Sequence, residues 1–116
     1  MSKKYSTGPI ENEGAPGTTI AQTIFVKVYN DGDDRARVRI KVYALNGEKD
    51  RIAKETINVR GESSGFVVVD VSNAFQYVVE FKVERGKDVE LSVFPKDANN
   101  SLIAAQRVLH SELKRV

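Results

Sequence analysis

Basic and apolar side chains alternate along one stretch of the chain, RARVRIKVYAL, which spans residues 35–45. From residue 35 to residue 41, every second position carries a cation, and these are Arg35, Arg37, Arg39 and Lys41. Because successive side chains of a β-strand point to opposite faces, a period of two predicts a strand with one face in the core and one in solvent. The row of cations would lie on the solvent face.

Turn residues divide the rest of the chain beyond residue 19 into further short β-rich runs. We expect strands within residues 20–30, 35–45, 51–60, 66–71, 76–84, 88–95 and 102–113. Asn30 to Asp34 reads as a turn, and Asn46-Gly47 is a strong hairpin signal. About seven strands at this spacing predict a single all-β domain, a β-sandwich of immunoglobulin-like or jelly-roll type.

Three of these runs depart from simple alternation. Ile52 lies on one parity while Ile57 and Val59 lie on the other, which a β-bulge or a switch between sheets would reconcile. The run FVVVDV at 66–71 is continuously apolar and predicts a strand covered on both faces. Residues 102–113 fit either a helical stripe or a strand, and the preceding turn favours the strand.

The predicted core consists of the apolar positions that share a parity within each run. These residues are Ile24, Val26, Val28, Val38, Ile40, Val42, Val68, Tyr77, Val79, Phe81, Val83, Val89, Leu91 and Val93.

The first 19 residues differ in composition from the rest of the chain. They hold two of the three prolines and three of the eight glycines, so neither helix nor regular sheet is expected there. We predict an extended N-terminal arm at 1–19, followed by the sandwich domain at 20–116. Tyr5 and Ile10 would anchor this arm, and Pro9 and Pro16 would stiffen it. The arm could add a strand to the exposed edge of a neighbouring subunit, or fold back on its own sandwich.

Composition excludes several classes of protein. Lys and Arg number 18 against 16 Asp and Glu, and this near balance argues against a dedicated nucleic-acid binder. Without cysteine there is no disulfide, thiolate nucleophile or sulfur-ligated metal. No apolar run is long enough to insert in a membrane, and the N-terminus does not resemble a signal peptide. We expect a protein made in the cytoplasm, which reaches a cell or spore surface only after assembly.

The basic row has three readings. Carboxylates on neighbouring strands, for which Glu80, Glu84 and Glu90 are suitable, could pair with it on a solvated face. It could instead be a subunit contact. A track for nucleic acid is the third reading, and it would need stacking aromatic residues nearby.

Chemistry-bearing motifs are few. The segment from Gly61 to Gly65 matches G-x-S-x-G, but a strand leaves it where a nucleophile elbow needs a helix. Ser63 and the single histidine, His110, are therefore not expected to form a catalytic pair. The acidic turn NDGDD lacks the order of an EF-hand calcium loop. We predict no catalytic residue, no cofactor and no metal site, and hence no enzyme.

Three segments resemble small uncharacterised β-sandwich proteins of spore-forming Gram-positive bacteria: TIFVKVYNDGDDRARVRIKVYALNG, SSGFVVVDVSNAFQYVVEFKVE and AAQRVLHSEL. A flexible connector ahead of a β-sandwich is similar to the plan of endospore-appendage subunits. Those subunits cross-link their fibre through cysteines in the connector, which this chain lacks. The resemblance implies only a similar plan and carries over no functional residue. From the arm and the basic row we predict a self-assembling homo-oligomer or filament, with subunit contacts at Tyr5, Pro9, Ile10, Arg35, Arg37, Arg39 and Lys41. The alternative is a β-sandwich binding module for protein, carbohydrate or polyanion.

Overall fold

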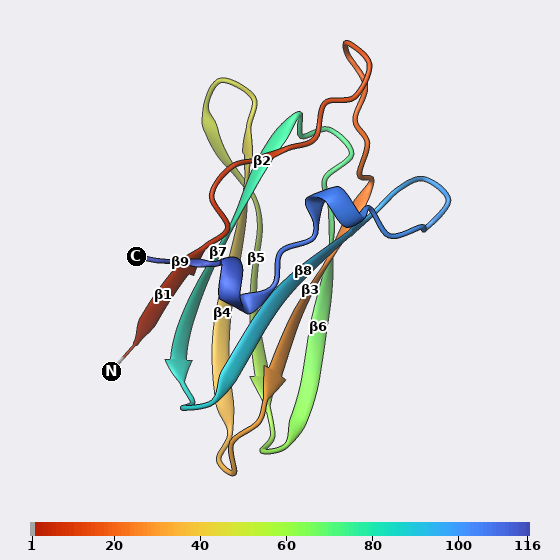
Figure 1. The fold of residues 1–116 in the computed structure, drawn as a ribbon. Coiled ribbons are helices and arrows are strands. Elements are labelled where there is room, and N and C mark those ends of the chain that lie inside the picture. The colour runs from red at the N-terminus through yellow and green to blue at the C-terminus, as the bar shows by residue number, and fades with distance from the viewer. Residues whose placement is uncertain (1) are drawn as a thin grey trace.

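The computed structural model describes residues 2–116 and consists of two antiparallel β-sheets packed as a sandwich (Figure 1). The described residues contain short 3-10 turns and no α-helix. No helix in this part of the chain has the length and apolar character needed to cross a membrane. The predicted all-β sandwich is therefore confirmed.

The larger sheet has the strand order β5-β4-β7-β1-β9, and the short strand β2 also pairs with β7. In that order its strands are β5 (Lys49–Val59), β4 (Ala36–Leu45), β7 (Gln76–Arg85), β1 (Lys3–Ser6) and β9 (Lys114–Arg115), and β2 is Ile10–Glu11. The strands β4 and β5 form the hairpin that the Asn46-Gly47 pair predicts. Gly47 adopts a φ of 96°, a conformation that a residue with a β-carbon rarely tolerates.

The smaller sheet has the order β6-β3-β8. The central strand β3 (Thr23–Asn30) pairs along its whole length with β6 (Ser63–Asp70) and with β8 (Val89–Lys96). The two sheets enclose one core, in which Tyr77 and Phe81 are the largest fully buried side chains.

Every predicted core residue is buried except Val68, whose side chain is 50% exposed. The prediction that 66–71 is covered on both faces is also wrong, because Phe66 is 57% exposed. Strand β6 lies at the edge of a sheet whose outer face has no covering layer within the described chain. Its inward residues are Val67 and Val69, and the outward ones face solvent.

The parity change in the third run is a β-bulge. Val42 pairs with Ala53, and the next residue, Tyr43, pairs with Arg51, so that Ile52 is the extra residue. The bulge lets Ile57 and Val59 return to the inward face, as one of the two predicted explanations requires.

Both chain ends depart from expectation. Residues 3–6 and 10–11 form strands on β7 of the same chain, which is the second of the two arrangements considered for the arm, although regular sheet was not expected within 1–19. Residues 102–113 are neither the expected strand nor a helix. They form isolated bridges to β8 and two 3-10 turns, Ala104–Gln106 and His110–Glu112, as the chain crosses from β8 to β9 (Figure 1). Ile103, Val108 and Leu113 pack against the core along this crossing and explain its apolar content.

Candidate functional site

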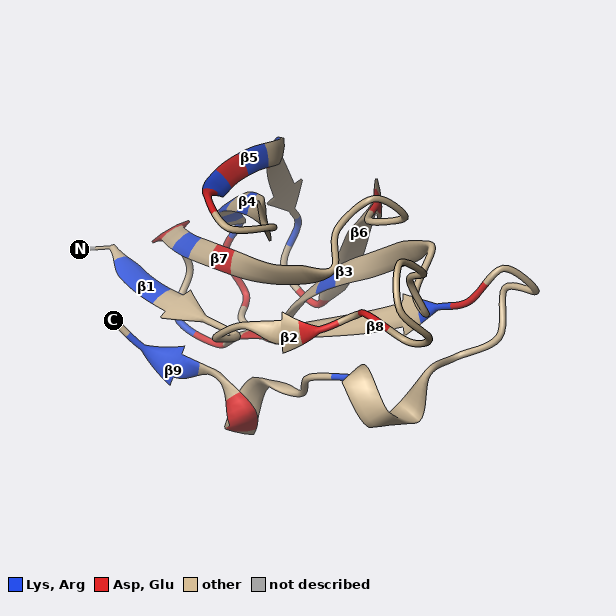
Figure 2. Cartoon of the chain, turned by 90° about the horizontal axis from the view of Figure 1, so that it is seen from above, with Lys and Arg blue, Asp and Glu red and all other residues tan. Residues whose placement is uncertain are grey.

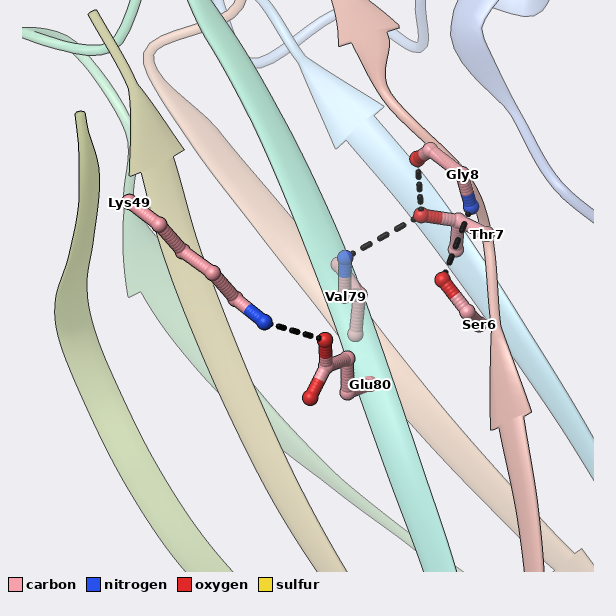
Figure 3. A network of polar contacts seen from close by, with 6 residues as sticks. All are labelled: Ser6, Thr7, Gly8, Lys49, Val79 and Glu80. Atoms are coloured by element: carbon pink, nitrogen blue, oxygen red, sulfur yellow. Dashed lines mark hydrogen bonds and ion pairs between the residues drawn. The ribbon is translucent and has the colours of Figure 1, made fainter. Parts of the chain in front are cut away.

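The N-terminal arm completes the edge of β7. Lys3 to Ser6 pair antiparallel with Glu80 to Val83, and Ile10 pairs with Tyr77. Between the two strands, the N–H of Thr7 donates to the carbonyl of Val79 at 3.0 Å. The N–H of Val79 donates in turn to Thr7 Oγ1 at 3.1 Å (Figure 3). A backbone edge that would otherwise be open is thus hydrogen-bonded by the arm of the same chain.

The predicted anchors lie where the arm meets the core. Tyr5 and Ile10 are half-buried against it, whereas Pro9 is exposed. The ring of Tyr5 also packs on His110, with 5.2 Å between centroids, and the Arg115 guanidinium lies 5.8 Å from its centre. The arm is therefore tied both to β7 and to the C-terminal segment.

A buried polar network, which sequence reasoning missed, fixes the root of the arm. Asn12 Oδ1 accepts the N–H of Ala21 at 2.7 Å and Nε2 of Gln106 at 3.0 Å. Asn12 Nδ2 donates to the carbonyls of Ala21 and Ala74 at 3.2 and 3.0 Å. Gln106 in turn accepts the hydroxyl of Tyr77 at 2.9 Å. The network joins the arm, β7 and the C-terminal segment, and burial raises the pKa of the Tyr77 hydroxyl above its ordinary value.

The basic row lies on the outer face of the larger sheet. Arg37, Arg39 and Lys41 point outward from β4, and Arg35 precedes the strand. Glu84 contacts two of them, with its carboxylate 3.7 Å from Arg37 Nε and 3.4 Å from Arg39 Nη2. The reading of a cross-strand-paired face therefore holds for these two arginines.

The other two carboxylates do not pair with the row. Glu80 faces Lys41 in register, but its carboxylate lies 3.0 Å from Lys49 Nζ instead (Figure 3). That contact raises the pKa of the Lys49 ammonium, chiefly through the hydrogen bond. Glu90 lies on β8, in the other sheet, because strands consecutive in sequence separate between the two layers here.

Like charges meet across three strands of the same face. Lys82 of β7 lies between Lys4 of β1 and Arg39 of β4 in the ladder register. These residues, with Lys41, line a cavity of about 160 Å³, and Arg39 Nε is buried there without a hydrogen-bond partner among residues 2–116. Figure 2 shows that β1 and β9, which pair at the edge of this sheet, also carry Lys and Arg residues. Glu80 lines the same cavity, and the Glu84 carboxylate lies 4.0 Å from Lys82 Nζ. The four cations outnumber these two carboxylates, so the face can attract anions.

The serine and histidine considered above do not come together as a catalytic pair. Ser63 donates its hydroxyl to the carbonyl of Gly61 at 3.3 Å, and His110 Nδ1 accepts the N–H of Leu91 at 3.2 Å. The acidic turn is organised by Asn30, whose Oδ1 accepts the N–H of Gly32 and whose Nδ2 donates to the carbonyl of Asp34. Each of these residues therefore has a local structural role.

Comparison with known proteins identifies the fold. No protein-family model matches the sequence, and no curated protein matches it. The Anabaena sensory rhodopsin transducer superposes with a TM-score of 0.53 at 13% identity, over 84% of this chain and 91% of that one. The crystal structure of Thermotoga maritima 1070 superposes with a TM-score of 0.54 at 12% identity, over 98% of this chain and 90% of that one. The chain thus shares a β-sandwich architecture with these proteins, and so low an identity shows the fold alone.

Proposed function

We propose that the chain is a structural, self-assembling subunit of a fibre, pilus-like appendage or coat, in which the N-terminal arm docks on a neighbouring subunit. The observation that carries the proposal is the strand that the arm adds to β7. Every copy of the chain offers the same slot, with the same register and the same pocket for Tyr5 and Ile10. A neighbour's arm can fill it with no new contact required.

The arm connects to the sandwich through an exposed loop that can serve as the hinge. Residues 13–19 form a small turn in which the N–H of Gly14 donates to the carbonyl of Thr18, and Gly17 has a φ of 79°. Extension of this turn would carry the arm, with Asn12, onto the next subunit. Such a contact is heterologous and continues into a ring or a filament.

The proposal follows the endospore-appendage plan of a connector ahead of a β-sandwich. Because the connector lacks cysteine, the fibre would be held by strand pairing and packing rather than by disulfides. In this proposal the protein is made in the cytoplasm, has no enzymatic activity, and reaches the cell or spore surface as an assembly.

An engineered disulfide distinguishes docking on a neighbour from docking within the chain. Ser6 and Glu80 are direct partners in the ladder, at a separation that suits a disulfide. In the double variant Ser6→Cys/Glu80→Cys, oxidised at high protein concentration, we expect a ladder of covalent multimers on a non-reducing gel. The two single-cysteine variants are the controls, and each can form dimers at most. Covalent monomers alone would contradict the proposal.

This test is preferable to deletion of the arm. A chain without residues 1–18 would lose Asn12 and leave the N–H of Ala21 and the amide of Gln106 without their buried partner. Unsatisfied buried groups cost about 1–3 kcal/mol each, so the deletion would impair folding as well as assembly.

The like-charged row of Lys4, Lys82 and Arg39 favours a second candidate function, that of a module for a polyanion. We expect Arg39→Ala/Lys82→Ala to weaken binding of heparin and to lower the salt slope of log K by about 0.7–0.9 for each lost phosphate-like contact. Lys87→Ala, in the β7–β8 loop, is the matched control. Equal salt slopes in all three proteins would exclude this face as the site.

A further inference from the structure

The outer face of the smaller sheet carries an apolar patch that the C-terminal segment borders through Leu102 and Leu109. Phe66 and Val68 on β6 lie beside Phe25 on β3, and the rings of Phe25 and Phe66 stack with 5.7 Å between centroids. Phe94 lies directly opposite Phe25 on the other side. Exposed apolar patches of this kind mark interaction sites in soluble proteins.

The strand register places the outward side chains in four rows across the sheet. From one end to the other, the rows are Ser64, Tyr29 and Glu90; Phe66, Lys27 and Ser92; Val68, Phe25 and Phe94; and Asp70, Thr23 and Lys96. Two cations and two carboxylates lie on this face, so it is neutral as a whole. Glu90 and Lys96 occupy opposite ends of the same strand.

We propose that this face binds the same face of a second copy of the chain, around a two-fold axis that crosses β3 between Lys27 and Phe25. The operation exchanges the end rows with each other and the central rows with each other, so every pairing occurs twice. Glu90 meets Lys96 of the other copy, and Phe66 meets Val68. The apolar stem of Lys27 lies against the ring of Phe25.

The same rows argue against the other occupants of the face. A two-fold axis along the strands would place Lys27 of one copy opposite Lys27 of the other, so that two like charges would meet in a contact that excludes water. A polyanion would meet Asp70 and Glu90 at the corners.

The area of the face indicates how stable a contact it can form. Three strands of eight residues cover roughly 27 by 14 Å, or about 400 Å² per copy. The two copies together would bury about 800 Å², which is below the size of most stable interfaces, so we expect a weak and transient association. This contact goes beyond the proposed function, because it does not use the arm. Where both contacts form, the arm would join successive subunits and the face would pair two such rows.

Sedimentation of the full chain from about 1 to 500 µM tests the contact. We expect Phe66→Lys to weaken the two-fold association at least tenfold, because each dimer contains the substitution twice. Ile52→Lys is the matched control, since Ile52 is exposed on the bulge of the other sheet. Both variants should keep the wild-type melting temperature. A wild-type chain that shows no association, or an effect equal to that of the control, would overturn the inference.

A charge exchange tests the axis itself. Lys96→Glu and Glu90→Lys should each abolish self-association, the double variant should restore it, and a mixture of the two single variants should form a heterodimer. No rescue in either arrangement would overturn the proposed pairing. Because these substitutions leave Ser6, Glu80 and the arm unchanged, the disulfide ladder reports the proposed function separately. If the charge exchange fails, the disulfide ladder can still form, and if the ladder fails, the charge exchange can still be measured.

Discussion

At the scale of single residues, the chain ends are held by polar side chains whose importance depends on burial. Asn12 lies in the segment ENEG, which reads as a solvated turn, yet its side chain is completely buried and bonds to three other parts of the chain. A buried amide side chain stabilises the fold only when each of its hydrogen-bond partners is present, because a buried group without a partner costs free energy. We therefore regard Asn12 and Gln106 as the residues that hold the arm and the C-terminal segment against the sandwich.

Tyr77 supplies a prediction for alkaline solution. Its pKa is raised in the folded state by burial, while in the unfolded chain it stays near 10.0. Above that pH the unfolded state releases a proton that the folded state keeps. The contribution of Tyr77 to stability is therefore fully present below pH 10 and decreases above it by up to about 1.4 kcal/mol per pH unit. Tyr77→Phe should lose about 1 kcal/mol at pH 7 with the hydrogen bond to Gln106, and then show a shallower alkaline decline. Urea unfolding at several pH values measures both effects. Equal declines in the two proteins would contradict the assignment.

At the scale of elements, alternation identified the strands correctly wherever one face meets the core and the other meets solvent. Strand β4 shows this most clearly, with Val38, Ile40 and Val42 buried and the cations outside. The rule failed for β6, because a run of apolar residues on both faces is equally compatible with a central strand and with an edge strand that has an uncovered outer face. The sequence contains no local signal that separates the two.

The two valines of β6 test this placement directly. Val69→Thr should destabilise the fold by about 1–3 kcal/mol, because its hydroxyl would be buried without a partner. Val68→Thr should change stability by less than about 0.5 kcal/mol when measured at a concentration where the chain is monomeric. Thermal or urea unfolding of the matched pair gives the answer. A larger loss for Val68→Thr would place the wrong face of β6 in the core.

At the scale of the whole molecule, the fold separates three surfaces that are mixed in the sequence. The edge of β7 that the arm fills and the basic row belong to the larger sheet, and the apolar patch lies on the outer face of the smaller one. A subunit of this shape can make contacts in several directions, which is what a fibre or coat requires. Of the predicted contact residues, Tyr5, Ile10, Arg37, Arg39 and Lys41 lie on strands of the larger sheet, while Pro9 and Arg35 lie just outside those strands. The disulfide test addresses the contacts of the arm.

The sequence by itself determined the strands from Thr23 to Lys96, the hairpin at Asn46-Gly47 and nearly all of the core, because side-chain alternation and turn chemistry act between near neighbours. Only the tertiary structure decided that the arm pairs with β7, that residues 102–113 cross between the sheets, and that Glu90 lies far from the basic row. Those outcomes depend on which distant strands become neighbours. Sheet order is set by the joint burial of all the apolar faces, and no short stretch of the chain records it.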